Sequence, residues 1–377
     1  MQKKITDEAF MKQALELARK GLGGTSPNPC VGAVIVKGGR IVAEGYHQKA
    51  GQDHAEIMAI KQMMLKSGIR VVDIDPALFR NATLYVTLEP CCHSGKTPPC
   101  VKTLIRAGFQ KIVVGMKDPF KKVNGRGIAY LRKHGIKVSL LRQNSKIHKA
   151  VRSLNQPFIK SVATGLPYVI LKAGLSLDGK IATVGGNSKW ITGEKARADA
   201  GLERKKCDVV MVGSGTIAAD NPELNGGLRI IVDNKLSLDV KSKVFRDENV
   251  LVACSDLAGL KNRKRFELAG IKFRSFGKDR VSIKKLLKYL GKNGIQSVFL
   301  EGGSGLNAAF FEENQQNSVM IDKILFYFAP KLIGGRDSLA VIGGRGVDKL
   351  SLALRIREPH VESIGDDLKY EGVINFY

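Results

Sequence analysis

Short apolar segments alternate with segments of helical periodicity along almost the whole chain, and this alternation is the strongest constraint on its fold. Near the start, two apolar segments flank Gly38-Gly39, which predicts a β-hairpin. Strand and helix patterns then take turns, as in βαβ units. We therefore expect an α/β fold, with a mixed sheet covered by helices on its faces. The strands expected in this first part cover residues 31–37, 40–46, 82–88, 111–115 and 137–141.

The alternation resumes after a polar and basic stretch at residues 144–165. We therefore predict two α/β domains, residues 1–146 and 147–377, and a chain of 377 residues at roughly 150 per domain agrees with that number. The second domain is expected to contain strands at 168–175, 208–212, 228–233, 250–255, 297–301 and 324–329, with its clearest helices at 194–206 and 282–290.

The chain is strongly basic, with 61 Lys and Arg against 35 Asp and Glu and a formal net charge of +26. Such a charge attracts nucleic acids, anionic membranes or phosphorylated small molecules. The start of the sequence has no apolar signal segment, and no apolar run approaches the roughly 20 residues that span a bilayer. We therefore expect a cytoplasmic protein without a membrane partner. In that compartment the six cysteines are expected to be metal ligands or buried thiols rather than disulfides.

Two short segments of the first domain carry the pattern of a zinc site. His54-Ala55-Glu56 begins a predicted helix, and Cys91 and Cys100 follow the predicted strand 82–88. A catalytic zinc takes three protein ligands and leaves one position open, so we predict His54, Cys91 and Cys100 as ligands. Glu56 has the place of the general acid and base in zinc deaminases. Cys92 and His93 are alternative ligands, and eight residues separate Cys91 from Cys100 where the general deaminase pattern has two.

The second domain contains a G-x-G-x-x-A match at Gly213–Ala218, followed by Asp233 at the end of another predicted strand. This resembles a dinucleotide-binding fingerprint, which must open a helix. Asp220-Asn221-Pro222 follows too soon, so we expect no crossover helix and no Rossmann domain. The glycine-rich turn could still lie against a phosphate, because glycine lets backbone N–H groups approach closely.

Three segments, TLEPCCHSGKTPPC at 87–100, PNPCVGAVIV at 27–36 and HAE at 54–56, resemble the deaminase half of the bifunctional riboflavin-biosynthesis deaminase/reductase family. The eight-residue gap between the cysteines fits that family. The resemblance implies a cytidine-deaminase-like α/β/α domain that uses zinc-bound hydroxide to replace an amino group of a phosphoribosylaminated diaminopyrimidinone. It also implies four substrate-binding residues: Asn28, His47, His93 and Lys96.

Four later segments, 171–182, 188–192, 213–224 and 301–307, resemble the reductase half of the same family. This implies a dihydrofolate-reductase-like fold that reduces a ribosyl group to ribityl with NADPH, and a homodimer formed through this domain. The residues implied to contact NADPH are Gly174, Trp190, Thr216, Asp220, Asn234, Gly302, Gly303, Ser304, Gly305 and Leu306. Those implied to face the substrate are Ser188, Arg204, Leu224 and Glu301.

The sequence departs from the family at two places. Phe120-Lys121-Lys122 follows Asp118-Pro119 where the family usually has an Asn-Pro step, and Asn124 is a candidate to compensate. Asn225-Gly226-Gly227 replaces the region of an arginine that helps to hold the substrate phosphate. Arg204 and Arg229 are the two candidates to take over that role.

An alternative function is a nucleic-acid base deaminase with an RNA-binding appendage. It is suggested by the stretch 111–149, which has eleven Lys and Arg residues and one acidic residue, Asp118. This stretch has no interleaved aromatic platform and no RNA-binding motif. We therefore favour a phosphorylated small molecule as the partner, with no nucleic acid, and interpret the basic stretch as a solvated surface.

Overall fold

The structure is a computed structural model that describes residues 6–70, 73–93, 98–225, 227–315, 320–375 and 377. The chain forms two compact units, Met1–Thr164 and Gly165–Tyr377. The boundary predicted near residue 147 falls inside helix α6 (Lys146–Leu154). This helix packs on α1 (Asp7–Arg19) and on β4 (Lys111–Met116), so the chain stays with the first unit until Thr164.

The first unit contains a five-stranded mixed sheet in the order β2-β1-β3-β4-β5. The hairpin β1–β2 forms as predicted around Gly38 and Gly39, which both have positive φ and so allow a two-residue turn. Strand β1 also pairs antiparallel with β3, whereas β3, β4 and β5 are parallel. The remaining bounds are β1 Gly32–Lys37, β2 Arg40–Tyr46, β3 Ala82–Leu88 and β5 Lys137–Leu140.

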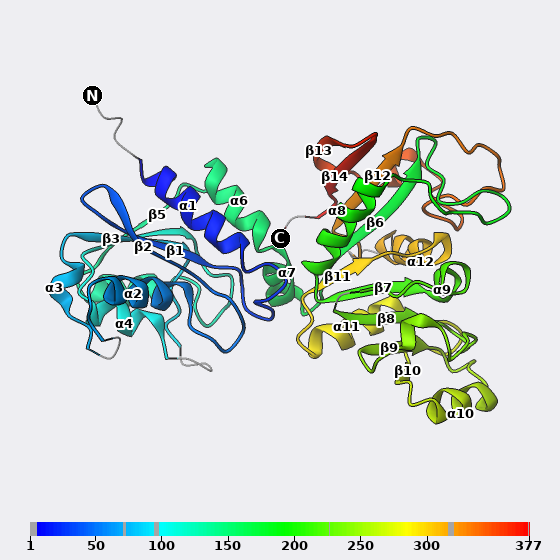
Figure 1. The fold of residues 1–377 in the computed structure, drawn as a ribbon, viewed down its shortest axis with the longest axis horizontal. Helices are drawn as coiled ribbons and strands as arrows, with labels where there is room; N and C mark the ends of the chain where they lie inside the picture. The colour runs from blue at the N-terminus through cyan, green and yellow to red at the C-terminus, as the bar shows by residue number, and fades with distance from the viewer. Residues whose placement is uncertain (1–5, 71–72, 94–97, 226, 316–319, 376) are drawn as a thin grey trace. The chain divides into compact units, whose positions relative to one another are not determined.

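Helices cover both faces of this sheet, which makes the unit a three-layered α/β/α sandwich (Figure 1). One face buries apolar side chains of α2, α4 and α5, and the other buries those of α1 with Ile147 of α6. Acidic Asp7 and Glu8 lie in the first turn of α1, where their negative charges interact favourably with the positive end of the helix dipole and stabilise the helix. The helices not yet bounded are α2 Ala55–Lys66, α3 Pro76–Phe79, α4 Cys100–Arg106, α5 Arg126–Lys133 and α7 Gln156–Thr164.

The second unit contains a nine-stranded sheet in the order β10-β9-β8-β7-β11-β6-β12-β14-β13. Its first seven strands in that order are parallel, and the hairpin β13–β14 adds two antiparallel strands at one edge. The strand bounds are β6 Tyr168–Ser176, β7 Val209–Gly213, β8 Leu228–Val232, β9 Val250–Cys254, β10 Phe273–Ser275, β11 Ser297–Leu300, β12 Lys323–Ala329, β13 Arg357–Ile364 and β14 Asp367–Val373.

Apolar helix faces also cover both sides of the second sheet. Helices α11 and α12 pack on one side, and α9 and α10 on the other. Helix α8 adds a smaller cluster with Phe299, Leu325 and Tyr327. The bounds are α8 Glu194–Lys205, α9 Ser214–Asp220, α10 Leu260–Leu268, α11 Ile283–Lys292 and α12 Ser304–Gln315, with short 3₁₀ turns η1 Lys243–Phe245 and η2 Leu350–Leu352.

The expectation that no helix follows the Gly213 motif was wrong. The seven residues of α9 connect the parallel strands β7 and β8, and Asn221 ends the helix in a left-handed conformation with φ 41°. The helix is short because Pro222 follows at once and cannot continue it. Within the described part of the chain, no helix combines the length and apolar character needed to cross a membrane.

Candidate functional site

The first candidate site lies where β3 ends and where α2 and α4 begin. His54 is the N-cap residue of α2, Cys91 follows β3, and Cys100 is the first residue of α4. The backbone N–H of Cys100 donates to Cys91 Sγ at 3.3 Å, and that of Val101 donates to the Cys91 carbonyl at 3.3 Å. Cys91 therefore satisfies two of the free N–H groups at the start of α4 and fixes Cys100 beside itself.

The three predicted ligands lie close together, with their donor atoms all within 4.8 Å of one another. His54 Nδ1 is 3.2 Å from Cys100 Sγ and 3.6 Å from Cys91 Sγ. Tetrahedral zinc with bonds of about 2.0–2.3 Å separates its ligand atoms by roughly 3.5 Å, so this spacing fits the ion. Two thiols and one imidazole are also a donor set that zinc prefers. Among the residues that the structure describes, these three form the one His/Cys/Asp/Glu group with metal-binding geometry.

The electrostatics of the site favour a thiolate at Cys91. A hydrogen bond from the Cys100 thiol lowers the pKa of Cys91, and the same bond together with burial raises the pKa of Cys100. The hydrogen bond to Cys91 raises the pKa of His54. A negative sulfur at the start of a helix is further stabilised by the helix dipole. Cys91 is therefore held in the thiolate form, which is the form that binds a metal ion.

Glu56 lies beside these ligands in the first turn of α2 and is only 3% exposed. Burial raises the pKa of its carboxyl group, so the group accepts and holds a proton more readily than an exposed glutamate. A catalytic zinc needs three protein ligands, and His54, Cys91 and Cys100 are placed to supply them. Glu56 is therefore available for proton transfer.

Asn28 and His47 form a hydrogen-bonded pair beside His54. Asn28 Nδ2 is 3.0 Å from His47 Nε2, and His47 Nδ1 is 3.0 Å from the carbonyl of Asp53. Because that carbonyl can only accept, Nδ1 carries the proton and Nε2 accepts from Asn28. Burial lowers the pKa of His47, which favours this neutral form. The rings of His47 and His54 meet edge to face at 5.2 Å.

Of the alternative ligands, Cys92 lies away from the triad and its thiol donates to the Lys122 carbonyl at 3.8 Å. The His93 ring is 5.7 Å from that of Phe120, a residue at the first family departure. Its Nδ1 is buried without a hydrogen-bond partner among the described residues. This atom is therefore a candidate to bind a ligand. Lys96 lies outside the described residues.

Glu89 is a buried carboxylate that the sequence analysis did not single out. It accepts backbone hydrogen bonds from Asp118 (3.2 Å), Gly125 (2.8 Å) and Ile128 (3.1 Å). These bonds anchor the start of α5 to the residue that precedes Pro90 and Cys91. The available sequence signal was an acidic residue placed directly between an apolar strand and a Pro-Cys step.

The second candidate site lies at the carboxyl ends of the adjacent parallel strands β8, β7, β11 and β6. Ligands of open α/β sheets usually bind at this edge. The glycine-rich turns after β7 and β11 meet there: a side chain at Gly303 would lie 3.5 Å from Thr216 Oγ1, and one at Gly213 would lie 3.6 Å from Leu306. Asn234 follows β8 at the same edge and is exposed.

Several of the predicted reductase residues contact one another. The Arg204 guanidinium binds both carboxylate oxygens of Glu301, each at 2.9 Å. Ser188 Oγ donates to Asp220 at 3.3 Å. Lys172, which the sequence analysis did not single out, lies 4.0 Å from Glu301.

Trp190 and Leu224 differ in their surroundings. The Trp190 ring is 63% exposed and stacks against the Arg197 guanidinium at 4.4 Å. Leu224 is buried in the apolar cluster of α9 and α10, so its backbone, at φ 50°, is the part that a substrate could meet. Gly174 packs against Thr192, to which an added side chain would come within 3.2 Å.

Arg229 is not available to bind a substrate phosphate. Its side chain is 1% exposed, donates to the Val244 carbonyl and forms a salt bridge with Asp247. It leaves β8 near its first residue, at the edge of the sheet opposite the glycine-rich turns. Of the two arginines considered, only Arg204 lies beside a predicted substrate residue.

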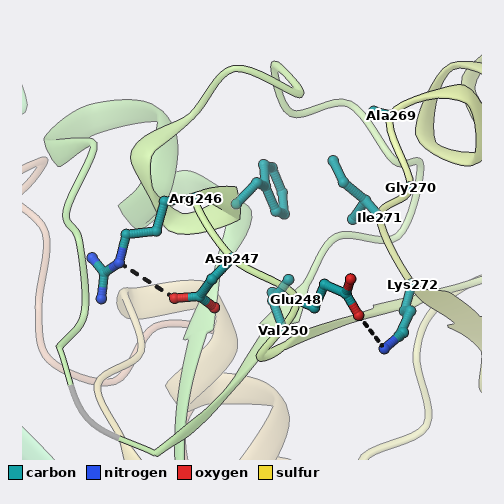
Figure 2. Close-up of a pocket in the computed structure, with 9 residues that line it drawn as sticks. Arg246, Asp247, Glu248, Val250, Ala269, Gly270, Ile271 and Lys272 are labelled. Carbon is teal, nitrogen blue, oxygen red and sulfur yellow. Dashed lines mark hydrogen bonds and ion pairs between the residues drawn. The ribbon is translucent and has the colours of Figure 1, made fainter.

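A hollow of about 200 Å³ lies at this opposite edge, near the start of β9 (Figure 2). Its charged groups are paired as Arg246 with Asp247 and Lys272 with Glu248. It contains none of the predicted site residues. Its lining consists of Phe245, Arg246, Asp247, Glu248, Val250, Ala269, Gly270, Ile271 and Lys272.

Two family models match the chain. Residues 4–116 match the cytidine and deoxycytidylate deaminase zinc-binding region, and residues 167–370 match the RibD C-terminal domain. The first range contains all three predicted ligands, and the second contains all the predicted reductase residues.

Full-length relatives carry both parts in the same order. The chain is 39% identical to the riboflavin biosynthesis protein RibD of Bacillus amyloliquefaciens over 97% of this chain and 96% of the relative. It is 38% identical to RibD of Actinobacillus pleuropneumoniae over 99% and 96%.

Solved structures agree with these matches. RibD of Acinetobacter baumannii has a TM-score of 0.81 at 33% identity, covering 97% of this chain and 98% of that one. A Thermotoga maritima protein has a TM-score of 0.80 at 35% identity with the same coverage. That protein is described as a diaminohydroxyphosphoribosylaminopyrimidine deaminase/5-amino-6-(5-phosphoribosylamino)uracil reductase.

The ligand assignment predicts opposite effects for two adjacent cysteines. Cys91→Ser should lose bound zinc, because it removes a thiolate ligand and weakens the contact that fixes Cys100. Cys92→Ser should keep zinc at the wild-type level, since Cys92 lies outside the triad. Zinc content of the purified proteins, measured by atomic absorption after dialysis, checks both. Equal zinc loss in the two variants would contradict the assignment.

Proposed function

The chain belongs to the RibD family of bifunctional riboflavin-biosynthesis deaminase/reductases, and on that premise we propose which residues carry its two reactions. Its first part is a zinc-binding deaminase, and its second part is an NADPH-dependent reductase. The observation that best supports the residue assignment is the triad of His54, Cys91 and Cys100 with buried Glu56 beside it.

For the first reaction we propose as substrate the 2,5-diamino-6-(5-phosphoribosylamino)pyrimidinone, the compound class in the description of the Thermotoga relative. Bound zinc supplies a Lewis acid that makes water a nucleophile near neutral pH. Glu56 takes the two protons of the attacking water in turn, and delivers the first to the ring nitrogen and the second to the departing amine. Water is consumed and ammonia leaves, so the 2-amino group becomes a carbonyl.

Asn28 and His47 are proposed to hold the pyrimidine ring. The hydrogen bond between Asn28 and His47 orients the Asn28 amide, and the Asp53 carbonyl fixes the His47 tautomer. His93, whose buried Nδ1 is without a partner among the described residues, is proposed as a further substrate contact. Lys96 remains proposed as a phosphate contact from the resemblance alone.

For the second reaction we propose that NADPH delivers a hydride to C1 of the ribosyl group, while a proton from solvent completes the opening to ribityl. The glycine-rich turns at Gly213 and 302–306 and the side chain of Thr216 are proposed to hold the cofactor, because they converge at the carboxyl edge of the sheet. The remaining proposed NADPH contacts are Gly174, Trp190, Asp220 and Asn234. The protein's part is to orient the cofactor and substrate, because the nicotinamide carries the redox chemistry.

Arg204 is the proposed substrate-phosphate contact in the reductase, with Glu301, Ser188 and the backbone of Leu224 beside it. The pair Arg204–Glu301 is bidentate and mostly shielded, with 21% and 13% of the two side chains exposed. This geometry aligns the guanidinium before substrate arrives.

We also propose that the second unit forms a homodimer and that the protein is cytoplasmic. Strand β13 is an exposed edge strand, and Val361 on it and Leu350 and Leu352 before it are 53%, 90% and 58% exposed. Proteins usually cover such edges. The absence of disulfides among the six cysteines, all of which are described, agrees with a reducing compartment.

The proton-transfer role predicts a selective loss of one activity. Glu56→Gln keeps the size of the side chain but removes the base, so ammonia release should fall by roughly 10²–10⁴-fold. Zinc content and NADPH oxidation with the deaminated intermediate should stay at wild-type levels. Ammonia release at more than half the wild-type rate would show that another group moves the proton.

The reductase assignment is tested at neighbouring basic residues. Arg204→Ala should raise KM for the phosphorylated intermediate about tenfold or more, because a charge-assisted contact is lost. Lys205→Ala, which changes an exposed residue in the same turn of α8, should have no effect. NADPH oxidation measured by absorbance gives both constants, and equal KM values for the two variants would remove Arg204 from the site.

The dimer is tested at the exposed edge. Val361→Lys places a charge on β13 and should shift the full chain from dimer to monomer in sedimentation equilibrium. Leu268→Lys changes an 80% exposed leucine of α10, which packs near β10 at the opposite edge of the sheet from β13, and should leave the dimer intact. A wild-type chain that sediments as a monomer at micromolar concentration would refute the proposal.

A further inference from the structure

The segment between the two family matches, residues 117–166, contains one buried polar side chain that reaches back to the first part of the deaminase unit. Helices α6 and α7 lie in this segment and meet at Asn155. Asn155 is polar but only 2% exposed, so its amide is removed from water and needs partners within the protein.

Those partners come from the other end of the unit. The backbone N–H of Cys30 donates to Asn155 Oδ1 at 2.8 Å, and Asn155 Nδ2 donates back to the Cys30 carbonyl at 3.1 Å. A third bond runs from Nδ2 to the Val151 carbonyl at 3.3 Å, which ties the amide to the last turn of α6. The Asn155 side chain thus satisfies both backbone hydrogen-bonding groups of Cys30, as a neighbouring strand would do in a sheet.

Cys30 ends the loop that carries Asn28. This loop, residues 25–30, consists of turns and bends rather than a helix or strand. Within it, the Asn28 N–H donates to the Thr25 carbonyl at 2.8 Å, and Thr25 Oγ1 lies 3.4 Å from Cys30 Sγ. Fixing Cys30 therefore fixes the position from which Asn28 reaches His47.

We propose that Asn155 is a positioning residue of the deaminase site, which holds the loop 25–30 so that Asn28 meets the substrate. The proposal rests on the assignment of Asn28 and His47 to the substrate pocket. The connection runs from Asn155 to Cys30, on to Asn28 and His47, and through the Asp53 carbonyl to the residue before His54.

The position of α6 does not depend on this amide. Ile147 of α6 packs with the apolar cluster of α1, which includes Phe10 and Leu17, and Val151 is fully buried. Removing the Asn155 side chain therefore leaves the helix docked and acts on the loop. The hydrogen bonds that the structure describes for Asn155 go to Cys30 and Val151, not to His54, Cys91 or Cys100, so zinc binding is expected not to depend on it.

The test uses the full-length enzyme, whose reductase activity serves as an internal standard. Asn155→Ala should raise KM for deamination about tenfold or more, with a smaller change in kcat, since a displaced contact residue weakens substrate binding. Zinc content and NADPH oxidation should not change. Asn144→Ala, the same substitution at an exposed residue just before α6, should match the wild type.

Two further variants separate positioning from general stability. Asn155→Asp keeps the acceptor for the Cys30 N–H but not the donor, so its KM should lie between those of wild type and Asn155→Ala. In an Asn28→Ala background, Asn155→Ala should add no further increase in KM, because the residue through which it acts is already gone.

The proposal is overturned if Asn155→Ala leaves KM unchanged, if it lowers zinc content, or if its effect is equally large in the Asn28→Ala background. A wild-type enzyme that releases no ammonia from the pyrimidine would instead refute the proposed function, and that result is visible before any variant is made.

Discussion

The two hydrogen bonds that Cys91 accepts are the interaction on which the first site depends. Its sulfur and its carbonyl take the first N–H groups of α4, so the end of a buried strand and the start of a helix are joined at one residue. Zinc ligation would use the same sulfur. Helix α2 brings His54 and Glu56 against this junction, and Glu89, two residues before Cys91, anchors α5. The site is therefore assembled by backbone groups at the ends of regular elements, and the packed helices and strands behind them hold those ends in place.

Much of this architecture could be predicted from residue patterns. The hairpin around Gly38, the parallel strands and the helix beginning at His54 were confirmed, because apolar periodicity and glycine turns are local signals. The family resemblance was confirmed by relatives that match almost the whole chain. The spacing of His54, Cys91 and Cys100 indicated the metal site because ligation requires particular residue types.

Other features could not be obtained in this way, because they depend on contacts between distant segments. The exposed strand β13 lacks the alternation of buried and exposed residues that marks a strand. A helix after Gly213 was not expected because Pro222 leaves no room for a long one, but the seven-residue helix α9 fits before it. The boundary between the units lies beyond residue 147 because α6 packs on α1, which belongs to the first unit. The pairing of Arg229 with Asp247 across 18 residues, which removes that arginine from the phosphate site, has no local signature.

The link between Cys30 and Asn155 spans 125 residues of the first unit, which runs from Met1 to Thr164. A contact of such high sequence separation forms late, since the intervening chain must be ordered before its ends can meet. During synthesis, the loop that carries Asn28 gains its anchor only after residue 155 has left the ribosome. The proposed zinc ligands, the last of which is Cys100, emerge well before that point. In a growing chain, the metal site can therefore be complete while the pocket beside it is not.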